Sequence, residues 1–414
     1  MVKGSPVQQR DGKRHVSLSP FLLMCVLGGF AIFSSTMSKN PALPLFIRTL
    51  NVPIETVGFI AAASTVVGVL ISLPAGILSD IIGRRRVLFI AAIIFATAPF
   101  LYLLVNVPWQ LVIVRVYHGL ATAILGPVAM AAVADSFQAS RGERMAWYSS
   151  ATMFGRFLAP FVGGALILGN NFMWVFLTAG VFGVLALTAV VRLPRASFHA
   201  PDTLHHRRSW GQIGNEVKFV LTHRGILATS IIEAVQYFGF GALETYLPIY
   251  LQEQRGFSTL QIGILFTMQI LVATLTKPVM GRLSDLYGRG TLIIGGLILG
   301  GISLGVITFS GNFFIIMGII GLFGLGLATV TASTSALVAD LSHATSYGSS
   351  LGVLSSIMDI GHSTGPMVAG VLVGSYQYRF SFGVTGAAMI FFACVFPFAM
   401  RGTGITSETH KSTG

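Results

Sequence analysis

Nine ionisable side chains interrupt the long apolar stretches of this chain, and they are the groups there that could do chemistry. A carboxyl group can take up and release a proton, and a guanidinium or ammonium group can bind an anion. Such groups are costly in apolar surroundings, so we expect them to face one another or a polar cavity. The first half of the chain carries Lys39, Arg115, His118 and Arg156, and the second half carries Glu233, Glu244, Lys277, Asp359 and His362.

Helical spacing places several of these groups on common faces. Glu233 and Glu244 are 11 residues apart, which is three turns plus about 20°. Lys277 lies near the end of its apolar stretch, where its ammonium group either reaches water or faces a cavity. The pairs expected to share a face are Glu233 with Glu244, Arg115 with His118, and Asp359 with His362.

The elements that position these groups are membrane-spanning helices. Hydrophobic residues make up 53% of the 414 residues and charged residues only 10%, whereas soluble domains carry roughly 25% charged residues. The apolar segments fit helical spans of about 20 residues, and the alternating segments of roughly 10 residues that build membrane barrels do not occur. We predict spans near 18–46, 55–79, 87–105, 109–134, 147–168, 172–193, 225–250, 260–281, 291–310, 313–338, 348–373 and 379–400.

Cysteine usage and the first segment add two expectations. Cys25 and Cys394 both fall inside predicted spans, so we expect no disulfide framework and no metal cluster. We also expect no cofactor. The first segment is too long for the core of a signal peptide and lacks a small-x-small cleavage site, so we interpret it as a retained helix.

The net charge of +12 orients the protein. If the N-terminus is cytoplasmic, the inner segments hold 19 of the 26 basic residues and the outer loops hold only Arg48, Arg255 and Arg379. This asymmetry predicts a multi-pass plasma (inner) membrane protein with both termini in the cytoplasm. The same distribution argues against a nucleic-acid partner.

The chain repeats itself at an interval of 205 residues. "GILSDIIGRRRVL" at 76–88 has nearly the same pattern as "GRLSDLYGRG" at 281–290, Gly58 and Asp135 match Gly263 and Asp340, and "ALPLF" at 42–46 resembles "YLPIY" at 246–250. We therefore predict an all-α fold of 12 transmembrane helices in two pseudo-symmetric six-helix bundles. The expected divisions are a first bundle at 1–193, a cytoplasmic linker at 194–224 and a second bundle at 225–414.

The linker contains His199, His205 and His206. These could bind a metal, but a solvated loop is the interpretation that we prefer, and we expect no metal site.

The repeated loop resembles the signature of the major facilitator superfamily, and the resemblance extends over essentially the whole chain. It implies a secondary transporter that works by alternating access, and not an enzyme. Ile81 and Leu286 stand where a basic residue often follows the aspartate. The residues of this gating motif are Gly76, Asp80, Gly83, Arg84 and Arg85 in the first copy, and Gly281, Asp285, Gly288 and Arg289 in the second.

The aspartates of the two loops lie on the side where other spans begin. A helix N-terminus attracts negative charge, by about 0.3–1 kcal/mol. In the outward-open state, Asp80 would bind the start of span 11 and Asp285 the start of span 5. The alternative is that each loop only anchors the topology.

Two further motifs resemble the drug:proton antiporter branch of that family. "RVYHGLATA" begins at Arg115 and resembles R-x-x-Q-G, with His118 in place of glutamine. "GRFLAPFVGG" begins at Gly155 and resembles G-x-x-x-G-P-x-x-G-G, with Ala159 in place of a glycine, and span 11 carries a related "GHSTGPMVAG". The residues of this helix-bend motif are Gly155, Pro160, Gly163, Gly164, Gly361, Gly365 and Pro366.

The polarised charges bear on the substrate. Many drug antiporters of this kind carry an acid in span 1, where this chain has Lys39 and Asn40, so a purely cationic drug fits poorly. A zwitterionic or anionic molecule fits, as does a lipophilic compound if the charges only neutralise one another. We predict a substrate cavity lined by Lys39, Asn40, Arg115, His118, Arg156, Tyr237, Glu244 and His362.

For proton coupling we predict Glu244 as the carrier, with Glu233 as an inward relay, Asp359 as a reserve and Arg115 as a coupling residue. Burial favours a neutral carboxyl group and a neighbouring cation favours a charged one, and Lys39 lies beside Glu244 in the pseudo-symmetric arrangement. The alternative is that Glu244 only neutralises Lys39. The predicted function is proton-coupled efflux by a monomer in the bilayer, with proton-coupled import as the alternative.

Overall fold

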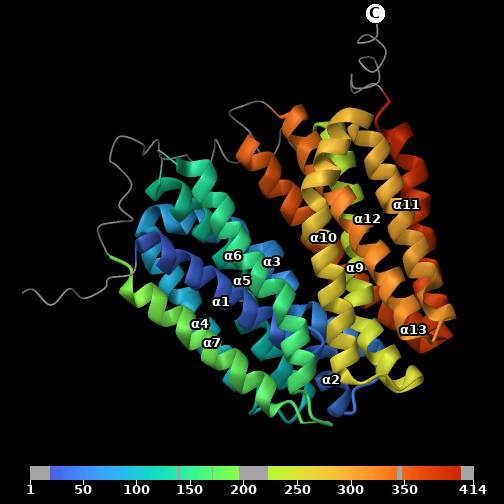
Figure 1. Ribbon diagram of the computed structural model, residues 1–414, viewed down its shortest axis with the longest axis horizontal. Coiled ribbons are helices and arrows are strands. Elements are labelled where there is room, and N and C mark those ends of the chain that lie inside the picture. The colour runs from blue at the N-terminus through green and yellow to red at the C-terminus, as the bar shows by residue number, and fades with distance from the viewer. Residues whose placement is uncertain (1–18, 138–139, 170, 195–221, 343–346, 402–414) are drawn as a thin grey trace, which may run out of the picture.

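The computed structural model describes residues 19–137, 140–169, 171–194, 222–342 and 347–401, and these are almost entirely helical (Figure 1). The expected linker and its three histidines lie almost wholly outside the described residues. The helices of the first half are α1 (Pro20–Lys39), α2 (Ala42–Thr49), α3 (Ile54–Ile82), α4 (Arg84–Tyr102), α5 (Pro108–Ser136), α6 (Arg141–Leu166) and α7 (Met173–Arg192). Those of the second half are α9 (Arg224–Arg255), α10 (Thr259–Tyr287), α11 (Arg289–Val306), α12 (Phe313–Leu341) and α13 (Tyr347–Ala399).

Local sequence signals explain where several helices begin and end. Ser19 caps α1 through its side chain and Pro20 occupies the first helical position, where the missing amide hydrogen costs nothing. Ser258 and Gln261 form a capping box at the start of α10. Gly83 and Gly288 adopt φ angles of 95° and 90° at the turns into α4 and α11, which explains a glycine at each of these motif positions.

The predicted 12 transmembrane spans are confirmed among the described residues. Ten stretches are long and apolar enough to cross a membrane. One of them, Ser350–Ala399, holds two spans, because the backbone leaves the helical conformation at Gln377. The remaining span is α6, which is less apolar because it carries Arg156 and a run of small residues. The first span is broken after Lys39 and resumes as α2.

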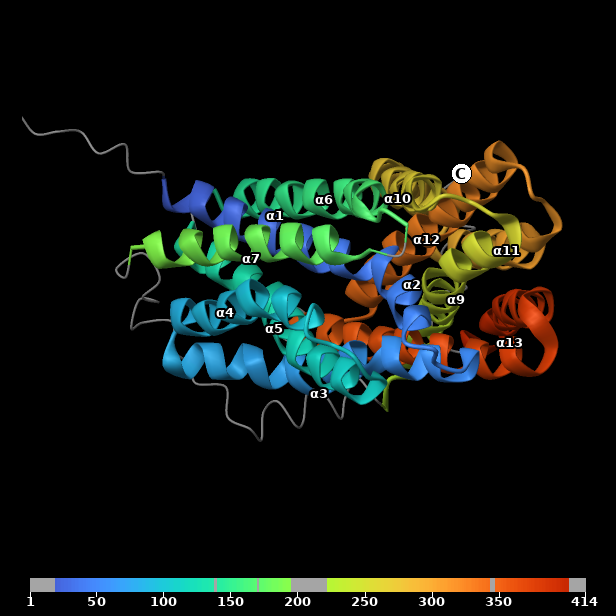
Figure 2. The same ribbon diagram turned by 90° about the horizontal axis from the view of Figure 1, so that it is seen from below.

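The spans form two bundles, α1–α7 and α9–α13, which lie side by side (Figure 2). Two helix pairs form most of the interface between them, α3 with the first part of α13, and α6 with α10. We call the face where α1 begins and α13 ends the terminal face, and the other the opposite face. The bundles approach each other at the opposite face and separate towards the terminal face (Figure 1).

Contacts and burial agree with this shape. Near the opposite face, one buried apolar cluster joins residues of both bundles, whereas the part of the first bundle nearer the terminal face has a cluster of its own. Tyr246 Oη donates to the Ile54 carbonyl at 3.2 Å. Arg48 Nε lies 2.8 Å from Glu253 Oε1. The structure is therefore closed at the opposite face.

The duplication predicted from sequence also governs the contacts between the bundles. A Cβ atom on Gly58 would collide with the Pro366 carbonyl, and a Cβ atom on Gly263 would collide with the Pro160 carbonyl. These are matching positions in the two repeats, so two matching glycine contacts hold the closed face together.

Candidate functional site

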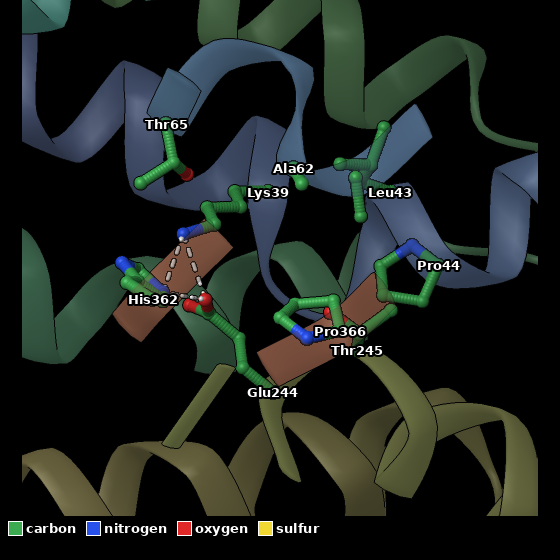
Figure 3. A pocket seen from close by; sticks show the side chains of 10 residues that line it. Lys39, Leu43, Pro44, Ala62, Thr65, Glu244, Thr245, His362 and Pro366 are labelled. Atoms are coloured by element: carbon green, nitrogen blue, oxygen red, sulfur yellow. Dashed lines mark hydrogen bonds and ion pairs between the residues drawn. The ribbon is translucent and has the colours of Figure 1, made fainter. Parts of the chain in front are cut away.

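A cluster of three ionisable side chains bridges the two bundles (Figure 3). Lys39 Nζ, at the end of α1, lies 2.7 Å from Glu244 Oε2 of α9. His362 Nε2 of α13 lies 3.0 Å from the same oxygen and 3.4 Å from Lys39 Nζ. One bundle supplies the cation and the other supplies the acid and the imidazole. We call this cluster the cross-bundle triad.

The second carboxylate oxygen of Glu244 also has a partner. Asn40 Nδ2 donates to Glu244 Oε1 at 2.6 Å, so both oxygens are bound, and the residue is only 7% exposed. Asn40 lies where α1 ends before α2 begins, and this break frees its side chain to turn toward α9. The pocket around the triad is completed by Leu43, Pro44, Ala61, Ala62, Thr65, Thr245 and Pro366.

Asp359 and Tyr237 lie beside this pocket. Asp359 is one turn before His362, and its Oδ2 approaches Gly68 of α3. Among the described residues, no hydrogen bond or ion pair holds this carboxylate. The ring centroid of Tyr237 lies 5.8 Å from that of His362. The structure thus gathers six predicted site residues, Lys39, Asn40, Tyr237, Glu244, Asp359 and His362, around one place.

Arg115 lies behind the pocket wall, within the first bundle. Its Nη2 donates to the Ala61 carbonyl at 2.8 Å and to the hydroxyl of Ser64. The side chain is 3% exposed and, within the described residues, forms no ion pair. Because Ala61 lines the pocket, Arg115 supports α3 where that helix faces the triad. Ser64 was missed from sequence, where a serine in an apolar span gives little signal.

The structure places His118 away from the predicted cavity. Its ring is 2% exposed and packs edge-on against Phe95 and Tyr102 of α4, and its Nδ1 lies 3.3 Å from Tyr102 Oη. The residue does follow Arg115 on one helix face, as predicted. That face turns into the interior of the first bundle, so His118 is not a wall of the pocket.

Glu233 and Glu244 both lie on α9 but have different surroundings. Glu233 Oε2 accepts a hydrogen bond from Thr334 Oγ1 of α12 at 2.5 Å and is 5% exposed. Glu233 therefore lies inside the second bundle, about 16 Å along the helix from Glu244 at 1.5 Å per residue. Thr334 was missed for the same reason as Ser64. Gln236 and Gln269 in the same interior are also buried, and their amide groups lack protein partners.

The gating loops contain two matching charge networks. Arg84 lies 2.5 Å from Asp80 Oδ1 and 3.2 Å from Asp135 Oδ2. Arg289 contacts Asp285 and lies 3.1 Å from Asp340 Oδ2. In this structure both loop aspartates therefore bind arginines of their own bundle. Arg85 donates to the Leu193 and Val191 carbonyls at the end of α7.

The helix-bend motif residues form close helix contacts. Gly155 lies against the Gly29 carbonyl of α1, and Gly361 and Gly365 lie against carbonyls of α9. Gly163 packs on Met37, and Gly164 packs on α10 near Gly263. Side chains at these positions would push the helices apart, so the motif fixes α6 on α1 and α10, and α13 on α9 and α3.

No group of three or more metal-binding side chains occurs within the described residues. The chemistry that the arrangement offers is ion pairing and proton transfer between two bodies that approach each other at one face.

The sequence of this chain matches a known protein family and several known proteins. The family model described as Major Facilitator Superfamily matches residues 25–263 and 229–413. Multidrug resistance protein 2 of Bacillus subtilis is 24% identical over 347 residues, covering 83% of this chain and 86% of that protein. Quinolone resistance protein NorA of Staphylococcus aureus is 22% identical over 345 residues, covering 83% and 87%.

Two solved structures show the same fold. The nucleoside transporter NupG, in a mutant form, superposes with a TM-score of 0.81 at 13% identity, covering 92% of this chain and 100% of that chain. A bacterial homologue of the human lysosomal transporter Spinster, in an inward-facing and unoccupied conformation, gives a TM-score of 0.78 at 15% identity, covering 94% and 98%.

Proposed function

The chain belongs to the major facilitator superfamily, and we propose that this transporter exports a small zwitterionic or anionic organic molecule in exchange for protons. It is a multi-pass membrane protein and not an enzyme. The names of its curated relatives, a multidrug and a quinolone resistance protein, favour efflux. The basic groups Lys39 and Arg156 favour a substrate with a negative group.

The observation that carries this proposal is the ion pair between Lys39 and Glu244, at 2.7 Å. Its partners belong to different bundles, so rocking of the bundles separates them. With Lys39 beside it, Glu244 stays a carboxylate, because the cation favours the charged form. Without Lys39, burial favours the neutral acid, so Glu244 takes up a proton. The rocking motion thereby moves a proton from one side to the other.

The direction of proton movement follows from the proposed orientation of the protein in the membrane. With the positively charged terminal face in the cytoplasm, the present conformation faces inward. Glu244 would then load its proton while the opposite face is open to the outside. It would lose that proton as Lys39 returns and the terminal face opens. Protons move inward in this scheme, and exchange against them moves substrate outward.

The role of Arg115 in this scheme is to hold α3 against the pocket. Glu233 is separated from the triad, and it serves as the proton group only if Glu244 does not. Asp359, which lies beside the pocket without a partner among the described residues, is the nearer substitute.

The loop aspartates are the proposed latches of the outward-facing state. When the bundles meet at the terminal face, Asp80 reaches the start of span 11 and Asp285 the start of span 5. Asp80→Asn should nearly abolish transport and leave the protein monodisperse in size-exclusion chromatography. Transport near the wild-type rate in this variant would reduce the loop to a topology anchor.

The decisive experiment uses Glu244→Gln in proteoliposomes with a zwitterionic fluoroquinolone as the probe. Glutamine resembles the protonated acid, so this variant should bind and exchange the probe. In vesicles with an acidic lumen, wild type should accumulate the probe and Glu244→Gln should not. Glu143→Gln removes an exposed acid of α6 that the proposed mechanism does not use, and it is the matched control, with accumulation retained. Uphill transport by Glu244→Gln would move the proton role to Asp359.

Import remains the second candidate, favoured by the similarity in fold to a nucleoside transporter and to a D-xylose–proton symporter. Reversing the gradient separates the two. An antiporter accumulates substrate in vesicles with an acidic lumen, whereas a proton symporter accumulates it in vesicles with an alkaline lumen.

A further inference from the structure

Arg156 of α6 faces the other bundle. Met153 and Pro160, one turn away on either side, both contact α10: Met153 Sδ lies 3.7 Å from Thr274 Oγ1, and the Pro160 carbonyl lies against Gly263. Residues three and four apart share a helix face. Arg156 therefore lies on the side of α6 that is turned to α10, and its side chain is exposed.

Lys277 lies on the matching side of α10. It follows Thr274, the residue in contact with Met153, by three positions, and its side chain is also exposed. The two helices run in opposite directions, and side chains lean toward the N-terminus of their own helix. Arg156 therefore leans toward the terminal face and Lys277 leans away from it. The two cationic groups converge in the space between the bundles.

This convergence brings together two like charges. Arg156 and Lys277 repel each other electrostatically, and neither forms an ion pair with another described residue. The acid that acts on Lys277 is Glu233, which is buried and held by Thr334. Arg156 also interacts electrostatically with His362 of the triad.

A purely structural role leaves the repulsion between the two cations unexplained. A lysine that only reaches for water would point toward the terminal face, whereas the Lys277 side chain leaves its helix in the direction away from that face. Two cations on facing bundles also oppose closure of the terminal face, because closing brings them nearer. An anion between them would remove this cost and bind both.

We propose that Arg156 and Lys277 form an anion subsite that binds the carboxylate of the transported molecule, with one cation from each bundle. This deepens the function proposed above and rests on it. The planar guanidinium binds a carboxylate through two parallel hydrogen bonds, and the ammonium group adds a point charge. Because each bundle holds the same anion, the loaded protein closes at the terminal face more readily than the empty one.

The test compares two probes of equal shape, 2-naphthoate and its neutral amide 2-naphthamide, by titration calorimetry with the purified full-length protein in neutral detergent. Wild type should bind the carboxylate at least about tenfold more tightly than the amide. Arg156→Gln and Lys277→Gln should each weaken carboxylate binding about tenfold and leave amide binding unchanged. Arg156→Lys, which keeps the charge, should lose less.

Arg282→Gln is the matched control, because it removes a cation from the same helix five residues further along, and it should bind like wild type. Equal binding of both probes by wild type, or no binding of either, overturns the proposal. Unchanged carboxylate binding in either glutamine variant overturns the two-bundle site, provided that the melting temperature shows a folded protein.

Two further outcomes are informative. If adding phosphatidylglycerol to phosphatidylcholine nanodiscs abolishes naphthoate binding, the subsite holds a lipid headgroup and the proposal of a transported anion fails. Carboxylate selectivity without proton-driven fluoroquinolone transport would leave the subsite standing and remove the proposed coupling. Proton-driven transport without carboxylate selectivity would leave the proposed coupling standing and remove the subsite.

Discussion

The two bundles share one backbone plan but differ in the chemistry of their interiors. The first bundle buries the cation Arg115 and the imidazole His118, at positions that correspond to Ile320 and Phe323 in the second. The second bundle buries Glu233, where the first has a glycine at the matching position. The repeat therefore tolerates apolar residues at each of these places, and the fold does not require the charges.

The difference teaches where to look for function in a duplicated transporter. Burying an ionisable group costs free energy wherever it occurs, so a charge present in one copy only has a purpose beyond packing. Gly58 and Gly263 are matching positions in the two copies, and each forms a close contact with the facing bundle. We assign these contacts to the packing between bundles, which both copies share. In the proposed scheme, the charged groups that only one bundle carries serve substrate binding and proton coupling.

The largest effect is expected from the shared contacts. Gly58→Leu and Gly263→Leu should each overpack the closed opposite face, which costs about 1–3 kcal/mol, or roughly 5- to 150-fold in the population of the closed state. Spin labels at Thr49→Cys of α2 and Gln254→Cys of α9, both exposed, should report longer distances in both variants. Gly318→Leu, where the added side chain meets open space, is the control. A response from only one of the two glycines would break the symmetry.

A smaller effect is expected from the charge that the first bundle alone carries. Arg115→Lys keeps the charge but replaces the planar guanidinium, whose Nη2 donates to both the Ala61 carbonyl and the Ser64 hydroxyl. We expect less than about half of the proton-driven transport rate in proteoliposomes. Ile320→Leu, at the corresponding position of the second bundle, should transport normally. Full transport by Arg115→Ala would show that the cation has no part in coupling.

The smallest effect concerns the unpaired amides of the second bundle. Gln269 is 1% exposed and both of its amide atoms lack protein partners, so Gln269→Leu should raise the stability by about 1 kcal/mol. Thermal unfolding in detergent measures this change. Gln252→Leu, at a half-buried position outside the bundle interior, should change the stability by less than about 0.5 kcal/mol. A loss of stability in Gln269→Leu would mean that water satisfies the amide.

The sequence was sufficient for the fold because apolar segments and a 205-residue repeat are local or periodic signals. It was also sufficient to suggest that Lys39 lies near Glu244, since the repeat relates their spans. It could not show that His118 turns away from the pocket. Residue spacing shows which side chains share a helix face, but what that face packs against depends on the positions of the other helices. The contacts that Ser64, Asp135 and Thr334 make with charged residues were also not predicted, because each contact joins residues far apart in the chain.

The Lys39–Glu244 ion pair has a further consequence, for the history of the protein. These residues are 205 positions apart, as are Arg48 and Glu253, which also touch. Residues that meet their own counterparts lie on the pseudo-two-fold axis. In a dimer of two identical six-helix chains, such positions would place lysine against lysine or glutamate against glutamate. Opposite charges on the axis require halves that differ in sequence, as they do in this fused chain, so divergence of the two halves made the proposed proton site possible.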